Sequence, residues 1–300
     1  MQLRVLPAAA ICVLTACGPK SGTVVSPGAV TPTPAPGPVA PLPPVVTAPI
    51  TRGGGDVVRL GPSALRYVVH QSFHVEQQFQ GQTQTIDRGI KVFIGAIIVG
   101  PADSAGYSVT VTVDSIVPDS GSIIPPTVNL GAARGLRYTG HVKPTGEFRQ
   151  TATSDSSVAQ AFTQIVGSLR NFFPRLPPAG LTLGAEWTDT STTNDRAGID
   201  VTVKAIAHSR AAAWDQRNGT RCLRVEVTSS YSVAGSGDQG GQPLQVTGTG
   251  TRTGVQFVAE DGRYLGGEAH DSSSITVGLP MQGMTVPVRQ ITHSTVTVLP

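Results

Sequence analysis

Three residues near the start of the predicted folded region carry side chains that commonly bind metals or transfer protons. His70, His74 and Glu76 are separated by even numbers of residues in a run that alternates apolar and polar side chains, so they share one face of a β-strand. Residues four apart on a strand lie about 13 Å apart, which is too far for His70 and His74 to coordinate one ion together. The spacing therefore predicts a solvated polar strand face, with no metal site and no bound cofactor.

The remaining candidates for chemistry are scattered. His141, His208, His270 and His293 are isolated in sequence, and their spacing does not indicate whether they meet in the fold. The chain has no Gly-x-Ser-x-Gly elbow, Ser-x-x-Lys pair, phosphate-binding loop or HExxH motif. We therefore predict a non-catalytic protein and assign no catalytic residue. An enzyme whose site is assembled from dispersed residues is the alternative.

Cys222 lies next to Arg221 and two residues before Arg224, and neighbouring positive charges can lower the pKa of a thiol. No second cysteine is placed to pair with it, so we interpret it as a passive strand residue. Trp187 and Trp214 are interpreted as core or rim aromatics rather than as a binding platform.

The first residues have the pattern of an export signal. MQLR carries a positive charge, and the uncharged apolar run VLPAAAICVLTA that follows is too short to span a bilayer. Its last residues, Leu14-Thr15-Ala16, and Cys17 together resemble the lipobox of bacterial lipoproteins. The resemblance implies that residues 1–16 are a signal peptide and that the Cys17 thiol carries the attached lipid. A plain secretory signal is the alternative.

The resemblance also implies a location. In that family an aspartate after the cysteine retains the protein at the inner membrane. Gly18 therefore favours the periplasmic face of the outer membrane in a cell that has two membranes. Residues 17–55 are predicted to be a disordered tether, because residues 18–50 hold 10 of the 24 prolines and proline prevents regular pairing. A recognition segment for a proline-binding partner is the alternative.

Residues 56–300 are predicted to form a single, mainly β domain. Period-two alternation recurs along them, most clearly in Tyr107–Asp114. The sequences Pro144-Thr-Gly146, Arg217-Asn-Gly219 and Glu260-Asp-Gly262 predict tight hairpin turns, and strands joined this closely must pair antiparallel. The expected fold is a curved antiparallel sheet or half-barrel of roughly 9–11 strands.

One amphipathic helix is expected at about residues 156–173. Apolar residues recur there at helical spacing, Ser157 and Gln160 are placed as a capping box, and Pro174 stops the helix. We expect it to pack on one face of the sheet. Gly248, Gly250 and Gly254 share one strand face, which indicates a coiled strand or the seat of this helix, with a ligand floor as the alternative.

The expected architecture is similar to the half-open β-barrels of Lol-type lipoprotein carriers. The segment Leu176-Pro-Pro to Gly184-Ala-Glu-Trp187 also resembles one found in uncharacterised bacterial envelope lipoproteins. In the carrier family an apolar cavity between sheet and helix holds acyl chains. The resemblance thus implies binding of an apolar ligand or another envelope component; a filled, purely structural or protein-interaction module is the alternative. The net charge of +3 without a basic cluster argues against nucleic acid as a partner.

Overall fold

The computed structural model describes residues 57–79, 81–122, 129–166, 171–196, 199–239 and 242–300. Within them, 11 strands form one antiparallel sheet that is not closed into a barrel, in agreement with the predicted mainly β fold and strand number. The strands are β1 (Ser63–Phe79), β2 (Gln82–Asp103), β3 (Gly106–Pro118), β4 (Arg137–Val142), β5 (Phe148–Thr153), β6 (Glu186–Arg196), β7 (Ile199–Arg217), β8 (Thr220–Gln239), β9 (Gln242–Ala259), β10 (Tyr264–Leu279) and β11 (Met284–Val298).

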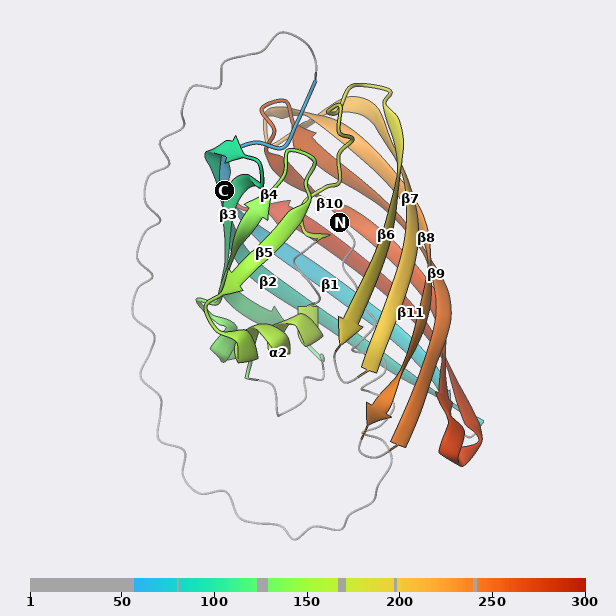
Figure 1. The fold of residues 1–300 in the computed structure, drawn as a ribbon. Helices are drawn as coiled ribbons and strands as arrows, with labels where there is room; N and C mark the ends of the chain where they lie inside the picture. Colours follow the sequence, from blue (N-terminus) through green and yellow to red (C-terminus); the bar gives the residue numbers. More distant parts are fainter. Residues whose placement is uncertain (1–56, 80, 123–128, 167–170, 197–198, 240–241) are drawn as a thin grey trace, which may run out of the picture.

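The first and last strands meet in the middle of the sheet, where β1 pairs with β11. The strand order is β5-β4-β3-β2-β1-β11-β10-β9-β8-β7-β6, so the chain runs outward to one edge at β5 and then returns from the opposite edge, β6. The sheet curves, and the two edge regions face each other across the open side (Figure 1). The connection from β5 to β6 therefore has to cross that open side.

The predicted turns lie where the strands reverse direction. Asn218 and Gly219 both have positive φ, at 49° and 75°, as a two-residue type I′ turn requires, and they join β7 to β8. Gly146 and Gly262 also have positive φ, in the turns that join β4 to β5 and β9 to β10. The three turn predictions are confirmed.

The predicted helix is shorter than expected. Helix α2 covers Ser156–Val166; residues 167–170 lie outside the described residues, and Phe172 and Phe173 are not helical. The residue before a proline is disfavoured in the helical region, which explains the conformation of Phe173. The predicted capping box at Ser157 was also wrong, because Asp155 accepts the hydrogen bond from the Val158 amide at 3.0 Å.

Helix α2 lies near one end of strands β4 and β5 (Figure 1). Its Phe162 ring is buried 6.0 Å from the ring of Tyr138 on β4, and the helix contacts the 3-10 helix η1 (Leu130–Ala133). A second 3-10 helix, η3 (Pro280–Gln282), lies between β10 and β11. In the part of the chain that the structure describes, no helix has the length and apolarity needed to cross a membrane.

The connection to β6 places aromatic side chains inside the curve of the sheet. Phe172 and Phe173 are buried with ring centroids 5.0 Å apart, and the Phe172 ring lies 5.1 Å from that of Tyr67 and 5.7 Å from that of Tyr264. The same connection is hydrogen-bonded to the turn between β4 and β5, where the Leu176 amide donates to the Thr145 carbonyl at 2.9 Å. These aromatic rings therefore fill one end of the interior.

The inward face of the sheet carries two apolar clusters rather than one. The first contains the aromatic residues above together with Val69, Val258 and Val296. The second contains Val75, Ile275 and Val288 toward the opposite ends of the same strands. Between the two clusters runs a set of inward-facing polar residues that we call the polar belt. Its members are Gln71 (β1), Gln290, Thr292 and Ser294 (β11), Asp271 and Ser273 (β10), Arg252 (β9), Ser229 (β8) and Ser209 (β7).

The three glycines of β9 face this interior and allow close approach of their neighbours. A Cβ on Gly248 or Gly254 would meet a backbone carbonyl of β10 at 2.5 and 2.7 Å respectively, and one on Gly250 would overlap the Tyr231 ring. The coiled-strand interpretation is thus supported. The expectation that these glycines seat the helix was wrong, because α2 packs beside β4 at the other side of the sheet.

Candidate functional site

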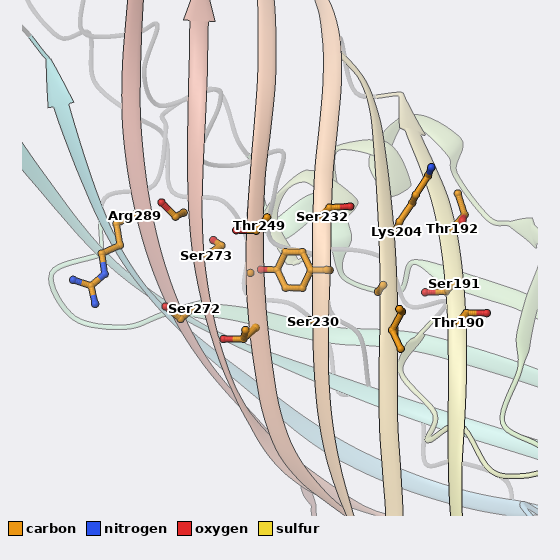
Figure 2. Close-up of a pocket in the computed structure, with 16 residues that line it drawn as sticks. Thr190, Ser191, Thr192, Lys204, Ser230, Ser232, Thr249, Ser272, Ser273 and Arg289 are labelled. Carbon is orange, nitrogen blue, oxygen red and sulfur yellow. The ribbon is translucent and has the colours of Figure 1, made fainter.

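A groove of about 720 Å³ crosses strands β6 to β11 on the exposed face of the sheet (Figure 2). The side chains on this face alternate with inward-facing residues such as Ala205, Gly250 and Ser273, which are buried. Exposed serine and threonine residues line most of it. They occur two to a strand, as Thr190 and Thr192 on β6, Ser230 and Ser232 on β8, Thr249 and Thr251 on β9, and Ser272 and Ser274 on β10. We call this feature the hydroxyl groove.

Strand register arranges these side chains in two rows that cross the strands. The first row is Ser272, Thr251, Ser230, Ile206 and Thr190. The second row is Arg289, Ser274, Thr249, Ser232, Lys204 and Thr192. Neighbouring members of a row are one strand apart, or about 4.8 Å. The groove thus presents hydroxyl groups at a regular short repeat, and each hydroxyl can both donate and accept a hydrogen bond.

The charges along the groove have one sign. Lys204 and Arg289 stand in the second row with three hydroxyl-bearing residues between them. None of the described residues that line the groove is an aspartate or a glutamate. The two cations are four strand spacings apart, roughly 19 Å along the sheet. This arrangement suits a polar ligand that is extended across the strands and carries an occasional negative charge.

The two histidines of β1, His70 and His74, each have an acidic partner. His70 Nε2 lies 2.6 Å from Asp119 Oδ2, whereas His74 lies 2.7 Å from Asp87 and 3.3 Å from Glu76. The hydrogen bonds to Asp87 and then Glu76 raise the pKa of His74. The hydrogen bond from His70 lowers the pKa of Asp119. His70 and His74 thus bond to different carboxylates.

Two histidines that are isolated in sequence meet in the structure. His270 and His293 are direct partners on β10 and β11, and their rings stack with centroids 4.3 Å apart. Burial, and then the neighbouring His270, lower the pKa of His293. His293 lines a second, smaller depression of about 490 Å³ together with His74 and Asp119. Sequence spacing could not reveal this pair, because it depends on the register of two strands.

The remaining two histidines contact neighbouring strands of the sheet. His208 lies 3.0 Å from the Thr188 hydroxyl, and His141 pairs with Ser108 and Arg149 within the sheet. Among the residues that the structure describes, no three histidine, cysteine, aspartate or glutamate side chains gather closely enough to hold a metal ion.

Cys222 is fully buried. Burial and the nearby Asp215 raise the pKa of its thiol, which makes it less reactive rather than more. Trp214 stacks under the Arg221 guanidinium at 3.8 Å, and both Trp214 and Trp187 pack at the margin of the first apolar cluster. The two tryptophans thus lie at the rim of the core, as expected, and Cys222 is a buried residue of β8. The proposed lipid-attachment residue, Cys17, lies outside the described residues.

Comparisons with known proteins give little. No protein-family model matches the chain, and no curated protein matches it either. Among solved structures, the chain has some likeness to OccK2 (OpdF) of Pseudomonas aeruginosa, with 9% sequence identity and a TM-score of 0.27, covering 79% of this chain and 98% of that one. A likeness at this level carries no inference about function.

Proposed function

We propose that this protein is a lipid-anchored, non-catalytic component of the bacterial cell envelope that binds an acidic glycan in the hydroxyl groove. The observation that carries the proposal is the pair of hydroxyl rows across β6 to β10, the second of which also contains Lys204 and Arg289. A chain of sugar rings offers hydroxyl groups that both donate and accept, and its carboxylates would be attracted to the two cations.

The proposed location rests on the N-terminal sequence. The lipobox-like Leu14–Cys17 supports a lipid anchor, and Gly18 supports the outer membrane in a cell with two membranes. The proline-rich stretch after Cys17, at about 3.1 Å per residue, could separate the sheet from the membrane by up to about 100 Å. That reach would allow the hydroxyl groove to meet a polymer that lies away from the lipid surface.

A polar ligand on the exposed face is favoured over an apolar ligand between sheet and helix. Phe172, Tyr67 and Tyr264 pack against each other inside the sheet, and Phe162 packs on Tyr138 beneath α2. Nucleic acid is disfavoured, because affinity for a phosphate backbone needs several closely spaced cations and the groove has two that stand far apart.

Binding can be tested with polygalacturonate as the acidic polymer and dextran as the neutral one. Thr249→Val keeps the side-chain shape and removes one hydroxyl from the middle of the second row. Losing one neutral hydrogen bond should weaken binding of polygalacturonate about fivefold. Thr253→Val is the matched control, since Thr253 is exposed on the same strand and does not line the groove.

The charge contribution has a separate test. Replacing both Lys204 and Arg289 by glutamine should reduce binding of polygalacturonate and its dependence on salt, and leave any binding of dextran unchanged. The proposal fails if wild type does not bind polygalacturonate at low salt, or if Thr249→Val and Thr253→Val bind polygalacturonate equally well. Chromatography of the recovered polymer should show no shortening.

A further inference from the structure

Two histidines lie side by side on the exposed face of the sheet. His270 on β10 and His293 on β11 are direct partners in the strand register, and their rings stack with centroids 4.3 Å apart. The rings of His70, His74 and His208 are hydrogen-bonded to other side chains. The rings of His270 and His293 have no hydrogen-bond partner among the described residues. Their nitrogen atoms are therefore free to bind another group.

The pair is open to solvent and is surrounded by short polar side chains. His270 is exposed, and His293 is half-buried in the wall of the depression of about 490 Å³. In the same row across the strands, Thr253 lies beside His270, and Ser72 lies beside His293. Glu268 is two residues before His270 on the same face of β10, and its negative charge favours a cation nearby. An ion in solution can thus reach both rings.

The spacing of the two rings is close to that of a metal chelate. An imidazole nitrogen binds Zn²⁺ at about 2.0–2.1 Å, so two nitrogens on one ion lie about 3 Å apart. The centroids of the stacked rings are 4.3 Å apart, which leaves about 1 Å to close. Because His270 is exposed, rotation of its side chain can bring one nitrogen of each ring to the same ion.

The kind of ion follows from the ligands. Ca²⁺ and Mg²⁺ prefer oxygen ligands, whereas imidazole suits Zn²⁺, Ni²⁺ and Cu²⁺, of which Cu²⁺ is generally bound most tightly. The protein supplies two ligands rather than three, since no third histidine, cysteine, aspartate or glutamate of the described residues completes a set. Solvent or a further molecule would occupy the other coordination positions.

We propose that His270 and His293 together bind one divalent transition-metal ion, with Cu²⁺ the most tightly held. The site lies on the same face of the sheet as the hydroxyl groove, with His270 two residues from Ser272 on β10. It binds a different class of ligand from the groove, and it does not depend on the binding of a glycan.

The test measures Cu²⁺ binding by the full-length chain in detergent. Protein stripped with a chelator is dialysed against Cu²⁺, and the bound metal is quantified by elemental mass spectrometry. Wild type should retain close to one ion per chain. Losing only the hydrogen-bonded neighbour of a ligand weakens metal binding about 10–100-fold, so His270→Gln and His293→Gln should each raise the Kd at least tenfold. His208→Gln is the matched control, because His208 is exposed on the same face and is bonded to Thr188.

A spectroscopic measurement identifies the ligands directly. The electron paramagnetic resonance spectrum of the bound Cu²⁺ should show coupling to imidazole nitrogens in wild type and in His208→Gln, and weaker coupling in either variant of the pair. All three substitutions are on the exposed face, so the circular dichroism spectrum should not change. The proposal is overturned if wild type retains less than about one ion per ten chains, or if His270→Gln or His293→Gln retains as much Cu²⁺ as His208→Gln.

Discussion

Tyr231 on β8 reaches across β9 and donates a hydrogen bond to Asp271 on β10, with 2.7 Å between Oη and Oδ1. Gly250 lies on the strand between them, and the tyrosine ring occupies the space that a Cβ at that position would need. One glycine thus allows an aromatic ring to lie flat over its strand and to bring a hydroxyl to a buried carboxylate. Both the hydroxyl groove and the polar belt depend on these strands keeping their register.

Gly250→Ala should destabilise the protein. The added methyl would overlap the Tyr231 ring, and the ring is held in place by Asp271 and by the second apolar cluster. Overpacking of this kind costs about 1–3 kcal/mol. The free energy of unfolding can be measured by urea denaturation. Gly95→Ala is the control, because no atom lies within 4 Å of a Cβ built there; it should be neutral or stabilise by up to about 1 kcal/mol.

Tyr231→Phe should raise the pKa of Asp271 further. Burial already raises that pKa, and the hydrogen bond from Tyr231 is the largest effect that opposes it. The folded protein then binds a proton more readily than the unfolded chain, so stability falls as the pH rises from the unfolded value near 3.8 through the raised folded value. The variant should extend this fall to higher pH. The free energy of unfolding of both proteins, measured by urea denaturation across pH 4 to 8, tests this. Superimposable wild-type and variant profiles would contradict it.

The pKa of His74 should lie above its ordinary value, because hydrogen bonds to two carboxylates favour the protonated ring. Its pKa is raised first by Asp87 and then by Glu76. A raised histidine pKa stabilises the folded state below the unfolded value of 6.5, and this contribution is lost as the pH rises through the folded pKa. NMR titration of the His74 ring should show its pKa falling in Asp87→Asn and falling by less in Glu76→Gln. Equal titration curves in all three proteins would rule out the assigned cause.

The strands could be predicted from the sequence because alternation repeats in every one of the long segments. The turns could be predicted because residues such as Asn218 and Gly219 adopt positive φ easily. The sequence does not predict which distant residues the strand pairing places side by side. The pairing of β1 with β11 joins segments more than 200 residues apart, and no local signal indicates it. The His270–His293 stack, the two hydroxyl rows and the polar belt all follow from pairings of this kind.

The glycines of β9 and helix α2 show that packing partners, too, cannot be predicted from local sequence. The sequence indicates that Gly250 needs room, but whether a helix, a neighbouring strand or a ring occupies that room depends on residues far from β9 in the chain. The end of α2 was misplaced for a related reason. Phe172 and Phe173 continue an apolar pattern that fits a helix, yet they are buried among aromatic rings from β1, β5 and β10.

The anchor itself is open to a direct test through Cys17. In Cys17→Ser the thiol that would receive the lipid is replaced by a hydroxyl, so the mature chain should carry no acyl group and should partition into the aqueous phase on detergent extraction. Intact-mass measurement of the wild-type protein should show the added mass of two or three acyl chains, since fewer would not hold a protein stably at a membrane. Cys12→Ser is the matched control, because Cys12 lies inside the segment that would be removed, and its product should be indistinguishable from wild type. Membrane partitioning of Cys17→Ser equal to that of wild type would contradict the lipid anchor while leaving the binding proposals for the sheet intact.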